Sequence, residues 1–137
     1  MTRLDSGLHL IHAGTALVGR ALHETEDLSP KVLRVDTDDR DAIWIVEALP
    51  DGRYNLYSKG APAGIEDNGT AGPVVTFLVD QADAVTWELA PVADTGNAYR
   101  ITGPQGTSWA VTGAGEQSRI EAVPTPGDVF TFTRIGP

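Results

Sequence analysis

The feature that most constrains the fold is an aromatic residue that recurs at a fixed interval. Trp44, Trp87 and Phe130 are 43 residues apart each time. Each lies in a segment that alternates apolar and polar residues, and a second apolar residue two positions later recurs with it. A period of two places alternate side chains on one face of a β-strand. Three recurrences of one strand pattern predict an all-β chain made of three related units.

A second alternating pattern recurs in a different phase, at intervals of 46 and 45 residues. Its three copies are Leu8–Ile11, Tyr54–Tyr57 and Tyr99–Thr102. The second copy follows Asp51-Gly52, and Asp-Gly between two alternating segments is a strong signal for a β-hairpin. We therefore expect residues 44–49 to pair with 54–58, and residues 87–92 to pair with 99–102.

Each unit contains two more short apolar runs, which brings the expected total to twelve strands. These runs are Ala16–Arg20, Val32–Val35, Ala63–Glu66, Val74–Val79, Ser108–Thr112 and Arg119–Val123. Four strands taken three times at a period near 45 residues predict a β-trefoil. We expect a single domain over residues 1–137, with three four-stranded repeats at approximately 7–52, 53–96 and 97–137.

Composition excludes several classes of function. The 137 residues include no cysteine, so neither disulfides nor thiolate chemistry is possible. The formal net charge is −9, and such a surface repels phosphate backbones and anionic lipids, so we expect neither nucleic-acid nor membrane binding. The first residues show no basic segment leading into an apolar one. We expect a cytoplasmic monomer that acts after release or ingestion.

Signatures of enzymes and of metal sites are missing. Residues 106–110, Gly-Thr-Ser-Trp-Ala, lack the final glycine of a nucleophile elbow. His9 and His12 are an odd number of residues apart on an expected strand, so they point to opposite faces and cannot share a metal ion. We expect no catalytic residues, no metal and no cofactor.

Carbohydrate binding is an alternative for a chain of this fold class. Many lectins with a β-trefoil fold carry a Gln-x-Trp pattern in each repeat, but Ala42, Val85 and Asp128 stand two positions before the recurring aromatic residues. Trp109 is the one tryptophan outside those positions, and it is the candidate for an exposed stacking surface.

The longest departure from the repeats lies between the second and third expected strands. Its middle is polar, it contains no glycine, and Pro30 ends it. Proline fixes its own φ angle and favours an extended conformation in the residue before it. The segment is therefore predicted to be an extended, stiff loop. The candidate binding residues in it are Glu24, Thr25, Glu26, Asp27, Leu28 and Ser29.

The sequence resembles the cospin-like serine protease inhibitors of mushrooms, which are small β-trefoils without cysteine. The resemblance runs over nearly the whole chain, in short segments whose order and spacing match. They include residues 17–20, 30–31, 43–49, 52–56, 76–80, 87–92, 97–101 and 130–133. The resemblance implies a protease as partner, a role in defence, and inhibition by a loop that occupies the protease cleft.

In the trypsin-inhibiting members of that family, a basic residue of the same loop enters the primary specificity pocket of the protease. The matching position here is Glu26, give or take one residue. Like-charge repulsion between a carboxylate and the buried aspartate of a trypsin-type pocket is unfavourable. Because Glu26 stands where those family members have a basic residue, the resemblance implies a target other than a trypsin-like protease. A glutamate-preferring protease would suit Glu26, and a chymotrypsin-like protease would suit Leu28.

Two alternatives stay open within the inhibitor hypothesis. The segment Ser58, Lys59 and Gly60 displays a lysine between the fifth and sixth expected strands and is a possible second binding loop. Other mushroom trefoils inhibit cysteine proteases through different loops, so cysteine protease inhibition is a further possibility.

Overall fold

The structure is a computed structural model, and it describes residues 4–20, 29, 31–35, 42–66, 71–79, 84–92, 97–113, 118–124 and 126–136. Twelve β-strands lie in these ranges. They are β1 (Gly7–Ala13), β2 (Ala16–Arg20), β3 (Lys31–Val35), β4 (Ile43–Ala48), β5 (Tyr54–Ser58), β6 (Ala61–Ile65), β7 (Gly72–Thr76), β8 (Glu88–Pro91), β9 (Ala98–Thr102), β10 (Ser108–Thr112), β11 (Arg119–Val123) and β12 (Phe130–Gly136). A 3₁₀ turn, η4 (Pro104–Gly106), separates β9 from β10.

Both hairpins expected from the sequence are present. β4 pairs antiparallel with β5 from Trp44↔Ser58 to Ala48↔Tyr54, and β8 pairs with β9 from Glu88↔Thr102 to Pro91↔Tyr99. The turn between β4 and β5 uses the residues that predicted it. The Asp51 carboxylate accepts a hydrogen bond from the backbone N–H of Arg53 at 3.0 Å. Gly52 adopts a φ of 91°, which a residue without a Cβ does at little cost.

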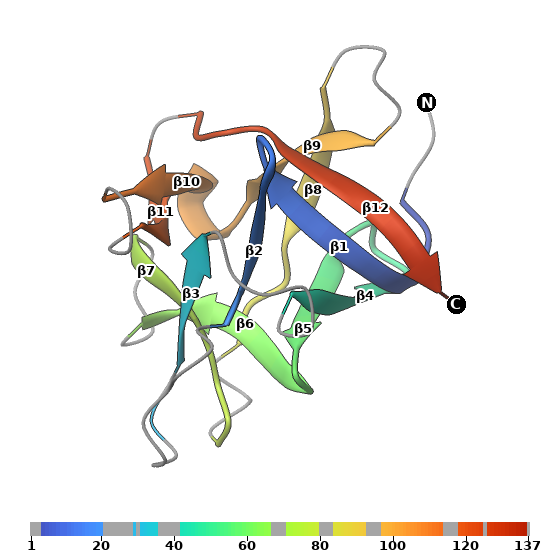
Figure 1. The fold of residues 1–137 in the computed structure, drawn as a ribbon, viewed down its shortest axis with the longest axis horizontal. Coiled ribbons are helices and arrows are strands. Elements are labelled where there is room, and N and C mark those ends of the chain that lie inside the picture. The colour runs from blue at the N-terminus through green and yellow to red at the C-terminus, as the bar shows by residue number, and fades with distance from the viewer. Residues whose placement is uncertain are drawn as a thin grey trace.

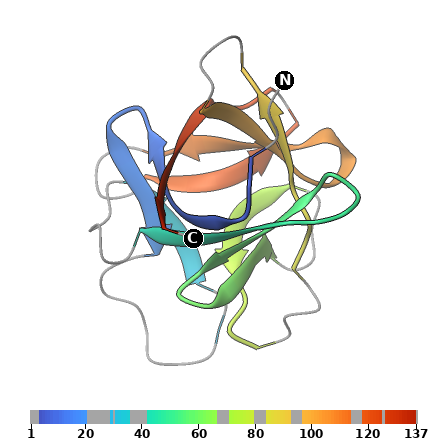
Figure 2. The same ribbon diagram turned by 90° about the vertical axis from the view of Figure 1, so that its right-hand side faces the viewer.

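Ten of the twelve strands form a closed ring of antiparallel pairs (Figures 1 and 2). The ring runs β10-β11-β3-β7-β6-β5-β4-β1-β12-β9 and returns to β10 through the pair Thr102↔Ser108. β2 and β8 lie outside this ring: β2 pairs with β1 and β3, and β8 pairs with β9. Within the described strands, closure leaves the ten ring strands without a free edge.

This pairing corrects the fold predicted from the sequence. The all-β class holds, but the prediction of a β-trefoil with three four-stranded repeats is wrong: the molecule is a closed ten-stranded barrel that carries two further strands. Strands at matching positions of the expected repeats pair differently, since β2 is outside the ring while β6 and β10 are in it. Sequence spacing indicates which residues face the core, whereas the ring depends on which strands exchange hydrogen bonds.

The barrel closes around a cluster of four aromatic rings. Trp109 lies at its centre, with ring centroids 6.0 Å from Trp44, 5.3 Å from Trp87 and 6.0 Å from Phe130. All four side chains are fully buried, so the recurring aromatic residues are core residues as the alternation predicted. The prediction that Trp109 offers an exposed stacking surface is wrong, because its exposed fraction is 0%.

The three indole N–H groups of the core differ in their hydrogen bonds. Trp44 Nε1 donates to the Val18 carbonyl at 2.9 Å, and Trp87 Nε1 donates to the Ala63 carbonyl at 3.4 Å. Trp109 Nε1 is buried with no hydrogen-bond partner in the part of the chain that the structure describes. An unpaired buried donor costs free energy, so the burial of the Trp109 ring in the apolar core and its contacts with the neighbouring rings must offset that cost.

This difference predicts unequal costs for two chemically identical substitutions. Trp44→Phe removes the hydrogen bond to the Val18 carbonyl, while Trp109→Phe removes a donor that has no partner among the described residues. We expect Trp44→Phe to lower the free energy of unfolding by about 1–3 kcal/mol more than Trp109→Phe does. Urea unfolding followed by far-UV circular dichroism measures both. Equal losses would contradict the assignment of the two indole hydrogen bonds.

A histidine is also enclosed in the barrel wall. His9 of β1 is 1% exposed, its ring packs edge-on against Phe132 at 6.1 Å, and its Nδ1 lies 3.2 Å from the Gly7 carbonyl. Burial lowers the pKa of His9 below its ordinary value of 6.5, because the charged ring would lose its hydration. The Gly7 hydrogen bond opposes this shift, and the positive charge of Arg134 adds to it.

The lowered pKa predicts a loss of stability in weak acid. As pH falls through 6.5, the unfolded chain takes up a proton at His9 before the folded chain does, so the free energy of unfolding decreases until the folded-state pKa is passed. Urea midpoints measured between pH 7.5 and pH 5 test this. His9→Gln should make the free energy of unfolding less dependent on pH in this range. His12→Gln, on the opposite side of the strand, should keep the pH dependence of the wild type. A profile unchanged by His9→Gln would show that another group is responsible.

Candidate functional site

The ends of the connection between β2 and β3 are well defined. β2 ends at Arg20 and β3 begins at Lys31, and the two strands pair through Val18↔Val35, Gly19↔Arg34 and Arg20↔Leu33. Of the six predicted binding residues in the connection, only Ser29 is among the described residues, and it is exposed. The other five, Glu24, Thr25, Glu26, Asp27 and Leu28, lie outside them, and their role stays a prediction.

Both ends of this connection are attached to neighbouring strands by buried polar contacts. The Arg20 side chain is 6% exposed, and its Nη1 donates to the Ser58 carbonyl of β5 at 3.3 Å. Lys31 is 5% exposed, and its carbonyl accepts a hydrogen bond from Thr76 Oγ1 of β7 at 3.5 Å. Arg20 is held through its side chain and Lys31 through its backbone, so these two contacts fix the positions from which the connection departs and to which it returns.

The predicted second loop is a tight turn of two residues. Ser58 pairs with Ala61, and between them Lys59 and Gly60 have φ angles of 52° and 79°. Two successive residues with positive φ are typical of the type I′ turn that joins hairpin strands. Ser58 is fully buried, and its hydroxyl has no hydrogen-bond partner among the described residues. Of the three predicted residues, Lys59 and Gly60 are exposed and Ser58 belongs to the core.

The conformation of Lys59 limits what this turn can do. A segment that binds a protease cleft as a substrate does must be extended around the residue that enters the specificity pocket. Lys59 lies in the left-handed region, which is the opposite sign of φ from an extended strand. The turn therefore presents a lysine side chain at the surface but not a substrate-like backbone.

The contact between Arg20 and Ser58 brings the two predicted loops together. Arg20 is the last residue of β2 and Ser58 the last residue of β5. In Figures 1 and 2 the end of β2 and the β5–β6 turn lie at the same end of the barrel. The sequence contains no signal for this proximity, since 38 positions separate the two residues.

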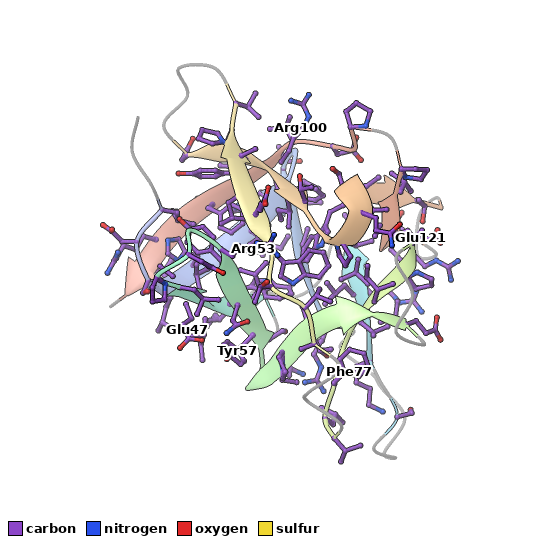
Figure 3. The ribbon with its side chains drawn as sticks, turned by 180° about the vertical axis from the view of Figure 1, so that it is seen from behind. Glu47, Arg53, Tyr57, Phe77, Arg100 and Glu121 are labelled. Carbon is purple, nitrogen blue, oxygen red and sulfur yellow. The ribbon has the colours of Figure 1, made fainter. Side chains whose placement is uncertain are left out.

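A shallow groove beside the β5–β6 turn was not foreseen from the sequence. It encloses about 550 Å³ between β1, β4 and β5, and it is lined by Ser6, Gly7, Leu8, Ile45, Val46, Glu47, Tyr57 and Gly60. Its polar rim is formed by Glu47, which accepts hydrogen bonds from Tyr57 Oη at 3.1 Å and Asn55 Nδ2 at 2.8 Å. Figure 3 labels Glu47 and Tyr57 close together in this region. Burial raises the pKa of Tyr57, and the Glu47 carboxylate raises it further.

A smaller polar pocket of about 300 Å³ lies between β8, the end of β9 and the η4 turn. It is lined by Arg53, Thr86, Glu88, Thr102, Gly103, Pro104, Gln105 and Gly106. Arg53 and Glu88 approach to 3.7 Å, but more than half of each side chain is exposed, so solvent weakens the pair.

Two further findings concern only the described residues. They contain no group of three or more histidine, cysteine, aspartate or glutamate side chains arranged to hold a metal ion. Among them there is also no helix with the length and apolar character needed to cross a bilayer.

Comparison with known proteins shows what the chain is related to. The family model described as peptidase inhibitor I66 matches residues 1–130. A serine protease inhibitor from Lentinula edodes is 41% identical over 119 residues, covering 83% of this chain and 80% of the relative. These matches confirm the resemblance to fungal cospin-like inhibitors.

Solved structures agree with this assignment at the level of the fold. A proteinase inhibitor from Coprinopsis cinerea superposes with a TM-score of 0.79 at 24% identity, covering 96% of this chain and 99% of that one. SeviL, solved with an asialo-GM1 saccharide, superposes with a TM-score of 0.69 at 15% identity, covering 94% and 98% of the two chains. At such identities the likeness extends to the fold alone. The match over residues 1–130 and the 41% identity together place this chain in the peptidase inhibitor I66 family, as a protease inhibitor and not an enzyme.

Proposed function

We propose that the protein inhibits a serine protease by inserting the β2–β3 connection, residues 24–29, into the active-site cleft as a substrate would. The observation on which this depends most is the 41% identity to a serine protease inhibitor over 83% of the chain. The partner is therefore a protease. We propose in addition that the inhibitor binds it as a monomer, after release or ingestion.

The attachment of the connection supports this mode of binding. Arg20 and Lys31 flank it, and each makes a buried contact with a different neighbouring strand, β5 or β7. A loop whose ends are already fixed loses less conformational entropy when it binds, and affinity increases for the same contact area. Fixed ends also keep the two sides of a cut bond close together, which favours religation over release.

The charge of the loop sets the expected target. Glu26 at the specificity position disfavours a trypsin-type pocket, because its carboxylate would face a buried carboxylate without water to screen them. A pocket that accepts glutamate suits Glu26, and an apolar pocket suits Leu28. The left-handed conformation of Lys59 makes the β5–β6 turn a poor candidate for the same role.

A charge reversal tests the loop and the specificity together. The wild-type protein is expected to inhibit a glutamate-preferring or chymotrypsin-like enzyme, and Glu26→Arg should gain trypsin inhibition by roughly 100-fold or more, because it replaces repulsion by attraction in the pocket. Inhibition constants measured against trypsin, chymotrypsin, elastase, subtilisin and a glutamyl endopeptidase give the result. Glu66→Arg, an exposed site after β6, is the matched control and should leave all constants unchanged.

The same panel separates the alternatives. If Glu26→Arg gains no trypsin inhibition and the wild type inhibits none of the serine proteases, the loop assignment is wrong. If the wild type inhibits papain or legumain but none of the serine proteases, the protein is an inhibitor of cysteine proteases. Carbohydrate binding has no comparable support, since all three tryptophans are buried in the core.

A further inference from the structure

Arg20 occupies an unusual position for a charged residue. It is the last residue of β2, it is 6% exposed, and its guanidinium reaches a backbone carbonyl 38 positions away. That carbonyl belongs to Ser58, which is fully buried and directly precedes the Lys59–Gly60 turn. A single side chain thus connects the start of the proposed inhibitory connection with the base of the β5–β6 turn.

The β5–β6 hairpin has little backbone pairing of its own. Its ladder registers only Tyr57↔Pro62 and Ser58↔Ala61. β4 holds β5 on its outer side up to Trp44↔Ser58, and β7 holds β6 from Ala63↔Thr76 onward. The Lys59–Gly60 turn lies beyond the last registered pair of the hairpin, so contacts at its base, such as the one with Arg20, help to set its orientation. A hydrogen bond from a buried charged donor is stronger than one from a neutral donor, and arginine offers several donors in a rigid planar fork.

We propose that Arg20 is a positioning residue that holds the start of the β2–β3 connection and the base of the Lys59–Gly60 turn in a fixed relation, so that the two contribute to one protease-contact surface. In this arrangement the connection enters the cleft, and the turn contacts the protease beside it. The part that concerns the protease rests on the function proposed above; the coupling of the two loops through Arg20 does not.

The chemistry of the contact explains why lysine would be only a partial substitute. A lysine ammonium at position 20 can donate to the Ser58 carbonyl, but it is a more strongly hydrated charge and lacks the planar fork of a guanidinium, so its burial costs more. Glutamine is shorter and uncharged, so Arg20→Gln removes the charged donor that bonds to the Ser58 carbonyl. We therefore expect the coupling between position 20 and the β5–β6 turn to be strongest in the wild type, weaker in Arg20→Lys and weakest in Arg20→Gln.

The first measurement is amide hydrogen exchange in the free protein, which needs no protease. Arg20→Gln should raise the exchange rate of the peptide covering residues 56–62 by about tenfold or more, the range expected for losing a hydrogen bond to a charged group. Arg20→Lys should lie between this variant and wild type. Unchanged exchange in that peptide for both variants would overturn the coupling.

Two controls separate positioning from a general loss of stability. Arg119→Gln removes an exposed arginine that pairs with Glu121 on β11, and it should leave residues 56–62 unaffected. Gly103→Ala places a Cβ 2.6 Å from the Trp87 ring, so it destabilises the core without touching Arg20. If Gly103→Ala, at equal or lower stability, raises exchange at 56–62 as much as Arg20→Gln does, the effect is global and the proposal fails.

The second measurement uses the most sensitive protease of the panel. Arg20→Gln should weaken inhibition by roughly tenfold or more and speed cleavage of the inhibitor, while Gly103→Ala should change neither by a comparable factor. If wild type inhibits and Arg20→Gln inhibits equally well, the shared contact surface is refuted. If wild type inhibits no protease, the proposed function and the shared surface both fail, and the exchange data alone decide the coupling.

Discussion

The structure depends on a packed group of aromatic rings at the centre of a closed barrel. A chain of this length without cysteine has no disulfide to stabilise it, so burial of apolar surface must supply the stability. Trp109 meets Trp44, Trp87 and Phe130 on three sides. Such large rings bury more area than any other side chains, and tilted and edge-to-face contacts add to that. The strands close into a barrel around this aromatic core, because closure gives the backbone N–H and C=O groups of the ten barrel strands hydrogen-bond partners on both sides.

The barrel fixes the ends of the connection that we propose to be inhibitory. Strands that exchange hydrogen bonds on both sides move little, and connections that leave them can be polar and variable without weakening the core. The β2–β3 connection leaves at Arg20 and returns at Lys31, and both residues are buried against other strands. The proposed mode of inhibition uses these fixed ends, because a loop that loses little entropy on binding is a better ligand for a protease than a free peptide.

Much of the core and two of the hairpins could be predicted from the sequence. The recurring positions of Trp44, Trp87 and Phe130 are fully buried, and Asp51-Gly52 forms the predicted turn. These features depend on local chemistry and on the two-residue period of a strand, which the sequence displays directly. The resemblance to an inhibitor family could be recognised for a related reason, since short core segments in a set order and at set spacing characterise a family of one fold.

The amino-acid sequence by itself determined the all-β class, the buried aromatic positions, the acidic character of the β2–β3 connection and the inhibitor family. Only the tertiary structure decided that ten strands close into one ring with β2 and β8 outside it, that Trp109 is in the core, and that Arg20 touches Ser58. The physical reason is the range of the interactions. Alternation and turn chemistry act between neighbours along the chain, whereas strand partners, the centre of a core and the reach of a buried guanidinium depend on segments that meet only after folding.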